Sequence, residues 1–263
     1  RTHTVGAASG DNDDLISSQA SSRAAARIME LFRKHGLDNC TFFVNTGLGG
    51  ANWSWVGEHY GRPDVPHLRY TVEQLKTGLY DGFDMECHTL THPSLKNLSA
   101  HAVVDEVQGD ADNILEITGI RPVGISWPGG DTEWNDNNLT WVYEKTDIRF
   151  GRAAASTLSF DLPEYFLKWY PTCSFVETLP GMAADGLLDR FLAAPCEEDM
   201  LFYVWGHGYE LDIFGGTQGC WSYLDAMLEK IAAAAAEDED IVLVTNAEFY
   251  QLFKDDISAW KEG

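Results

Sequence analysis

Two histidines that could bind a metal ion stand four residues apart in the sequence HTLTHP, from His88 to Pro93. The run FDMEC before them alternates apolar and polar residues, which predicts a strand that ends at His88. A helix would also bring both imidazoles together, as in the His-Glu-x-x-His zinc proteases, but position 89 is Thr and Pro93 disfavours helix at His92. We therefore expect a loop that presents both rings, and a metal site here needs a third ligand.

An acidic cluster, DNDD at residues 11–14, follows the mostly apolar residues 3–9, which have the pattern of a buried strand before a turn. Two adjacent carboxylates can divide two tasks: one binds a cation, and its neighbour, kept ionised by that cation, acts as a general base on water. The alternative is a turn or a helix cap, where Asp and Asn are favoured for their local hydrogen bonds.

Two later segments also place polar groups where a strand ends. The apolar residues 201–205 stop at Gly206-His207, which again places a histidine at the end of a predicted strand, and the alternative is a structural histidine of a loop. In ISWPGGD, residues 125–131, glycines after a predicted strand permit a close approach of the backbone to a ligand. Because parallel strands end at one edge of a sheet, the acidic cluster and the three histidines are expected to meet there.

Alternating strand and helix patterns predict how these residues are positioned. Seven or eight strands with mostly helical crossovers favour an α/β fold, a distorted (β/α) barrel with seven or eight mostly parallel strands. An open doubly wound sheet is the alternative. Residues 1–263 are expected to form one domain, because no linker or repeat interrupts the pattern. We predict strands at residues 3–9, 40–44, 83–87, 122–126, 148–152, 166–170, 200–205 and 241–245, and helices at residues 21–35, 71–80, 100–118, 135–146 and 221–236.

A segment rich in Gly and Pro, residues 47–66, reads as a long loop and carries Trp53, Trp55 and Tyr60. Long loops in compact domains are often functional. The three aromatic side chains either stack on sugar rings or anchor the loop to the core, and the sequence leaves both interpretations open.

The formal net charge of −23 argues against nucleic acid and anionic membranes as partners, since Lys and Arg chiefly hold both. A neutral ligand fits better. No run of eighteen apolar residues is present. Five cysteines without close pairs favour a reducing compartment, so we expect a cytoplasmic rather than a secreted protein. Residues 1–9 lack a signal-like stretch, but the first residue is not Met, so an upstream signal stays an open alternative.

Over most of its length, the chain resembles the polysaccharide deacetylases of carbohydrate esterase family 4, the chitin-oligosaccharide and peptidoglycan deacetylase group. The family's His-Ser/Thr-x-x-His-Pro motif matches residues 88–93 in full, and its Phe-Asp-Asp-Gly motif resembles Asp13-Asp14. The resemblance implies that Asp13 is the general base and Asp14 a metal ligand. The Leu-x-His motif resembles residues 204–207 loosely, which implies that His207 is the general acid.

The sequence departs from this pattern at three places. Ser126-Trp127-Pro128-Gly129 stands where the family has Arg-x-Pro-Tyr, so the arginine that would orient the base is absent, although the Gly129 N–H can still contact an oxyanion. No glycine follows either Asp13 or Asp14, which leaves open a register with Asp11 as base and Asp13 as ligand. Of the family's Asp-Trp motif, residues 168–171 supply only the Trp.

The sequence thus leads to a hypothesis of metal-dependent deacetylation of an acetylated sugar or oligosaccharide, with N- or O-acetyl left open. Asp14, His88 and His92 hold a divalent ion, zinc first and cobalt or nickel as alternatives. A non-haem iron oxygenase, whose iron site also uses two histidines and one carboxylate, and a non-catalytic sugar-binding protein are the competing hypotheses. The expected substrate contacts are Trp127, Pro128, Gly129, Tyr170 and Trp205.

Overall fold

The computed structural model describes residues 3–11, 24–65, 67–195, 197–216 and 219–260. In this part of the chain eight strands form one sheet, in the order β5-β4-β3-β2-β1-β7-β6, with β8 paired to β1, and every strand pairing is parallel. The prediction of an α/β fold with seven or eight parallel strands is therefore confirmed. The strands are β1 (His3–Asp11), β2 (Thr41–Val44), β3 (Asp84–Cys87), β4 (Gly124–Ser126), β5 (Phe150–Arg152), β6 (Cys173–Ser174), β7 (Met200–His207) and β8 (Ile241–Val244).

The ring of strands is closed irregularly, as expected of a distorted barrel. On one side, a single parallel bridge between Arg152 and Trp169 joins the edge strand β5 to the segment that runs into β6. On the other, β8 pairs with the first half of β1, from His3 to Gly6, whereas β2 pairs with its end, at Gly10 and Asp11. The register of β1 against β7 shifts between these two halves. The first half of β1 thus pairs with β7 and β8, and its end pairs with β7 and β2.

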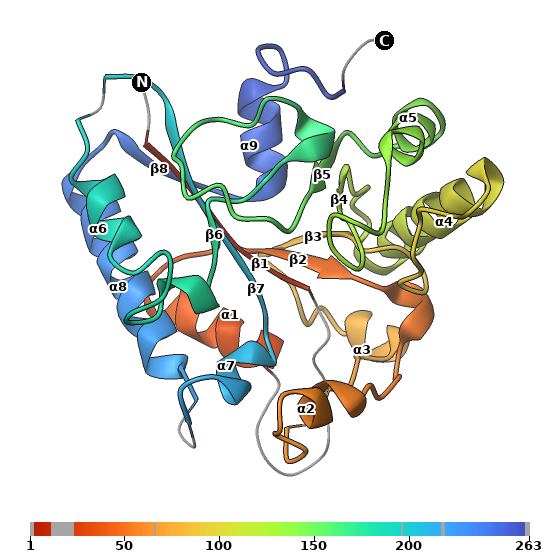
Figure 1. The fold of residues 1–263 in the computed structure, drawn as a ribbon, viewed down its shortest axis with the longest axis horizontal. Helices are drawn as coiled ribbons and strands as arrows, with labels where there is room; N and C mark the ends of the chain where they lie inside the picture. The colour runs from red at the N-terminus through yellow and green to blue at the C-terminus, as the bar shows by residue number, and fades with distance from the viewer. Residues whose placement is uncertain (1–2, 12–23, 66, 196, 217–218, 261–263) are drawn as a thin grey trace.

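Helices surround the strands, with α4 and α5 on one side and α1, α6 and α8 on the other (Figure 1). Each of the longer ones buries an apolar stripe, and α4 is also capped at both ends, by the Ser99 side chain and by Gly119 in the left-handed conformation. None of the described helices is long and apolar enough to span a membrane. Their bounds are α1 (Ala24–Lys34), α2 (Trp55–His59), α3 (Val72–Leu75), α4 (Ala100–Thr118), α5 (Asp136–Lys145), α6 (Leu187–Leu192), α7 (Glu210–Ile213), α8 (Trp221–Glu237) and α9 (Asn246–Phe253).

The strands separate two apolar cores. Phe42 packs with the helices outside the barrel, while its neighbour Phe43 joins an aromatic cluster with Phe150, Tyr203 and Phe249. Successive side chains on a strand point to opposite faces, so this division marks the outer and inner faces of the ring. The aromatic cluster therefore fills the inner face of the ring.

Three predictions of secondary structure are wrong. The predicted strand at residues 166–170 is a 3-10 turn, η2 (Phe166–Lys168), because the N–H groups of Phe166 and Leu167 donate to the C-terminal segment, to Ser258 and Ala259, instead of to a strand. The predicted loop at residues 47–66 contains helix α2, and the predicted helix at residues 71–80 ends at Leu75. The two-residue strand β6 was not predicted, and neither were α6, α7 and α9.

Candidate active site

The carboxyl ends of neighbouring strands bring the predicted residues to one edge. Asp11, the last residue of β1, pairs with His207, the last residue of β7. Two strands away, Val44 of β2 pairs with Cys87 of β3, so His88 is the first residue beyond this edge. The prediction that His88 and His207 lie at strand ends is confirmed. Asp13 and Asp14 lie outside the described residues, and so their predicted roles stay predictions.

His88 is held in one orientation by backbone groups. Its side chain is buried, and its Nδ1 lies 2.7 Å from the carbonyl oxygen of Ser126, the last residue of β4. A carbonyl can only accept, so Nδ1 carries the proton and Nε2 carries the lone pair. Metal-binding histidines are commonly fixed in this way. The buried Asn45 amide also donates to the His88 carbonyl oxygen. The chemistry of His88 therefore fits a ligand that binds through Nε2.

Asp110 of α4 connects the ends of β2 and β3, and sequence reasoning missed it. Its Oδ2 accepts the His88 backbone N–H at 3.0 Å, and its Oδ1 accepts from the Thr46 N–H at 2.8 Å and the Thr46 hydroxyl at 2.6 Å. Burial raises the pKa of this carboxyl group to about 7, although the three hydrogen bonds oppose the shift. A signal was present: Asp110 interrupts the buried stripe of α4 between Val107 and Ile114. A charge on an apolar stripe is worth examining for a partner.

His92 lies in a loop, as Pro93 predicted, and its backbone is unusual. Thr89 and His92 both have positive φ, 67° and 56°, which costs a residue with a Cβ of order 1 kcal/mol. The Thr89 hydroxyl accepts the His92 N–H at 3.1 Å, and the N–H of Leu90 donates to Glu106 of α4. Glu106 accepts from Leu90 through its backbone carbonyl oxygen. Together these two hydrogen bonds hold the loop so that the His88 and His92 ring centroids lie 4.8 Å apart.

An aromatic wall supports His92 from the side of the loop at residues 47–66. The Trp53 indole meets the His92 ring edge to face at 5.3 Å, and the Arg69 guanidinium lies 3.7 Å from the Trp53 ring centroid. The ring centroid of Trp55 lies 6.1 Å from that of Trp53, and Trp55 is 58% exposed. Trp53 thus anchors the loop to the site, whereas Trp55 presents an aromatic face to solvent.

His207 is oriented by a side chain of the short helix that follows it. Both oxygens of Glu210 take part: one lies 3.1 Å from His207 Nδ1, and the other accepts the His207 backbone N–H at 2.9 Å. The His207 side chain is 22% exposed. Glu210 is thus in contact with His207, whereas the nearby Asp212 carboxylate accepts from the Trp221 indole at 2.7 Å.

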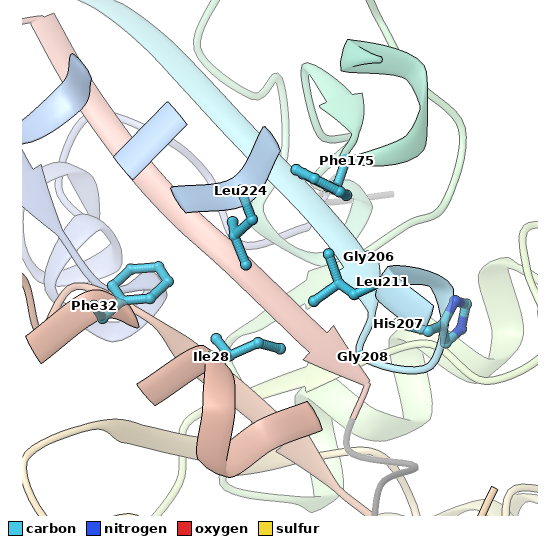
Figure 2. A pocket seen from close by; sticks show the side chains of 8 residues that line it. All are labelled: Ile28, Phe32, Phe175, Gly206, His207, Gly208, Leu211 and Leu224. Atoms are coloured by element: carbon cyan, nitrogen blue, oxygen red, sulfur yellow. The ribbon is translucent and has the colours of Figure 1, made fainter. Parts of the chain in front are cut away.

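A small apolar pocket adjoins the end of β7. Side chains from α1, α7 and α8 surround it, and the His207 imidazole is directed away from them (Figure 2). Its lining consists of Ile28, Phe32, Phe175, Gly206, His207, Gly208, Leu211 and Leu224. An apolar recess beside a polar edge is typical of small-molecule sites.

Arg152, which sequence reasoning also missed, stands opposite Ser126. The two residues pair in the register of β4 and β5, and the buried Arg152 guanidinium donates to the Ser126 hydroxyl. Ser126 occupies the position of the arginine that the sequence lacks in its Ser126–Gly129 segment. A guanidinium is therefore present at this point of the edge, supplied by the neighbouring strand.

The expected substrate contacts lie in different environments. Trp205 meets the His207 ring at 5.4 Å. Gly129 is exposed with a φ of 73°, whereas Trp127 is buried and its indole donates to the Leu167 carbonyl at 3.0 Å. Pro128 is also buried, and Tyr170 lines a surface pocket that none of the three histidines lines. Contact of all five with substrate stays a prediction.

Among the described residues, no three His, Cys, Asp or Glu side chains form a group that could hold a metal ion. His88 and His92 are brought together, and the predicted third ligand, Asp14, belongs to the segment outside that description. The ligand set is therefore complete only as a hypothesis.

A family model described as polysaccharide deacetylase matches residues 13–151, slightly more than half of the chain. No curated protein matches. Among solved structures, one match is the family 4 domain of a multidomain xylanase from the hindgut metagenome of Trinervitermes trinervoides, which is 13% identical with a TM-score of 0.51. The match covers 97% of this chain and 92% of the xylanase domain's chain. The cobalt complex of a family 4 acetyl xylan esterase from Clostridium thermocellum is 12% identical with a TM-score of 0.50, and covers 97% and 93%. At such low identity these two structures bear on the fold alone, and they share it.

Proposed function

The chain belongs to the polysaccharide deacetylase family, and from this premise we propose that it is a metal-dependent hydrolase that removes acetyl groups, chiefly N-acetyl, from a sugar, oligosaccharide or polysaccharide. One observation carries the proposal. His88, with its proton fixed on Nδ1 by the Ser126 carbonyl, lies beside His92 at the edge where β1 ends in Asp11. Two imidazoles together with a carboxylate are a donor set that suits a divalent ion in a hydrolase. The acidic residues 11–14, which begin at the end of β1 in the sequence, offer that carboxylate.

Asp14, His88 and His92 would hold the ion, with zinc as the first choice and cobalt or nickel as alternatives. Mixed nitrogen and oxygen ligands suit all three metals. The Clostridium thermocellum esterase was solved with cobalt, which supports a divalent metal in a site of this kind. When bound, such an ion supplies Lewis-acid polarisation of the acetyl carbonyl and of a water molecule.

The chain's own side chains carry the protons. Asp13 accepts a proton from the attacking water, and the Gly129 N–H donates to the oxyanion that forms, a contact typically worth about 3 kcal/mol. His207 then gives a proton to the leaving amine. Because Nδ1 of His207 faces Glu210, Nε2 is the atom that delivers this proton, and the Glu210 carboxylate stabilises the imidazolium that precedes the transfer.

Substrate contacts follow from the same edge. We infer that the sugar approaches between the Trp53–Trp55 wall on the His92 side and Trp205 on the His207 side. The exposed face of Trp55 suits stacking on a sugar ring. Trp127, Pro128, Gly129 and Tyr170 complete the proposed contacts, with Trp127 and Pro128 reaching the ligand through the backbone because both side chains are buried.

Acetate release from a panel of acetylated mono- and oligosaccharides tests the proposal. The comparison includes metal-loaded wild type, chelator-treated protein and the Asp13→Asn variant. We expect acetate from the first sample only. A metal-loaded wild type that releases no acetate from any substrate would overturn the proposal. Turnover that consumes oxygen with a 2-oxo acid would favour the oxygenase, and sugar binding without acetate release would favour the binding protein.

A further inference from the structure

One buried guanidinium lies between the two histidine-bearing parts of the edge. Arg152, the last residue of β5, has a side chain that is 1% exposed. It contacts the end of β4 on one side and the end of β7 on the other. A buried cation requires close polar or aromatic contacts. The guanidinium also meets the Ala153 carbonyl and the Phe43 ring, but the two contacts at Ser126 and Trp205 belong to strands that carry or support different histidines.

The first contact leads to His88. The Arg152 guanidinium donates to the Ser126 hydroxyl, and the carbonyl of the same Ser126 accepts the His88 Nδ1–H at 2.7 Å. The two residues also pair in the strand register. Arg152 therefore fixes the one residue whose carbonyl selects the His88 tautomer.

The second contact leads to His207. The Arg152 Cζ lies 4.2 Å from the ring centroid of Trp205, and the Trp205 ring lies 5.4 Å from the His207 ring. A desolvated cation–π contact of this kind is among the stronger ones. Arg152 thus orders the indole against which the His207 imidazole rests.

We propose that Arg152 is a positioning residue for the reaction, and that it aligns the His88 and His207 imidazoles through Ser126 and Trp205. This inference rests on the proposed function for its kinetic consequence but not for its geometry. Only arginine suits the place, since its planar group can donate from an edge and stack by a face at once, whereas a lysine ammonium can do one or the other. The arginine missing at Ser126 is thus replaced from the next strand.

Kinetics of Arg152→Met and Arg152→Lys, with Arg149→Met as the matched control, test the proposal. Arg149 lies one residue before β5 and bonds to the carbonyls of Thr146 and Ile148, away from both histidines. We expect kcat to fall about 10- to 100-fold in both Arg152 variants, with KM changed by less than about threefold, because misalignment acts on the chemical step. Arg149→Met should keep the wild-type kcat. Folded, metal-loaded Arg152→Met with a kcat within about threefold of wild type would overturn the proposal.

Double-mutant cycles identify the route. Ser126→Ala and Trp205→Leu each remove one partner of the guanidinium, and Ser126→Ala keeps the backbone carbonyl that accepts from His88. We expect either change to cost much less in the Arg152→Met background than in wild type, because the shared contact is already lost. Strict additivity in both cycles would show that Arg152 acts through neither partner and would overturn the proposal.

Imidazole ¹⁵N spectra separate this inference from the proposed function. In zinc-loaded and in chelator-treated protein, Arg152→Met should shift the ring nitrogens of His88 and His207 and leave those of His101, which lies exposed on α4, unchanged. Unchanged His88 and His207 signals would refute the positioning role even if the enzyme is active. A wild type without deacetylase activity, but with these shifts, would refute only the proposed function. If Arg152→Met does not fold, Arg152→Lys and Ser126→Ala give the same spectroscopic answer.

Discussion

The two parts of the site that carry histidines are built differently. His88 is buried and is held through its Nδ1, its N–H and its carbonyl oxygen by Ser126, Asp110 and Asn45. His207 keeps 22% of its side chain exposed, its Nδ1 and backbone N–H both meet the Glu210 carboxylate, and its ring contacts the rings of Trp205 and Tyr209. A metal ligand has to keep one protonation state and one direction, whereas a general acid has to gain and lose a proton. The difference in support matches the different tasks that we propose for the two histidines.

We expect the largest effect from a change at His88, the buried histidine. His88→Gln keeps a polar side chain but removes the nitrogen whose direction the Ser126 carbonyl sets. We expect loss of stoichiometric zinc, measured by metal analysis after dialysis, and a fall in kcat/KM of at least about 10³-fold. Full zinc retention in this variant would contradict the assignment of His88 as a ligand.

A change at His207, the partly exposed histidine, should lower activity without loss of zinc. His207→Ala should lower kcat by about 10²- to 10³-fold, the usual range for loss of a general acid, while zinc content stays at the wild-type value. Kinetics and metal analysis on the same preparation give both quantities. A kcat close to wild type would exclude the acid role, and loss of zinc together with activity would erase the contrast between the two parts of the site.

A change at Asp110 tests whether the hydrogen bonds that hold the His88 backbone matter for metal binding. Asp110→Ala leaves the His88 and Thr46 N–H groups without their acceptor. Unmet buried donors cost about 1–3 kcal/mol each, so we expect the free energy of unfolding to fall by about 2–4 kcal/mol in urea titrations. Zinc affinity should fall about 10- to 100-fold, as for other groups that support a ligand from behind. As a control, Asp112→Ala changes an exposed carboxylate of the same helix and should leave zinc affinity unchanged.

The other end of β3 gives the smallest effect, on stability alone. Burial raises the pKa of Asp84 to about 6, against 3.8 for an ordinary Asp, and it raises the pKa of Glu86 as well. The folded state therefore binds more protons than the unfolded state between these values, and stability falls as pH rises from about 4 to 6. Asp84→Asn should reduce this fall by about 2 kcal/mol in denaturation at pH 4 and pH 7. An unchanged pH dependence would show that the pKa of Asp84 is the same in the folded and the unfolded protein.

Much of the fold could be predicted from the sequence, because the run FDMEC before His88 alternates apolar and polar residues and residues 201–205 are apolar up to Gly206. Residues 166–170 failed for the opposite reason: their aromatic and aliphatic side chains are as typical of a strand as of any buried turn, and only the C-terminal segment decides between them.

The two supporting residues were hidden for a further reason. Asp110 serves the site from a helix whose pattern predicted only packing, and Arg152 is useful only because the register sets it opposite Ser126. Register is a relation between strands far apart in the chain, and no local pattern records it. The positions of His88 and His207 at strand ends could thus be predicted from the sequence, whereas the residues that contact them could be found only in the fold.

The pairing of β1 bears on how the site is made. The first half of this strand lies between β7 and β8, so His3 takes its place beside Ile241, near the other end of the chain. Contacts between residues so distant in the sequence form late and slowly in folding. The end of β1 also pairs with β2, which follows it closely in the chain, whereas β7 and β8 come much later. We therefore expect the meeting of Asp11 and His207, at the edge where the sheet is completed, to be a late step of folding.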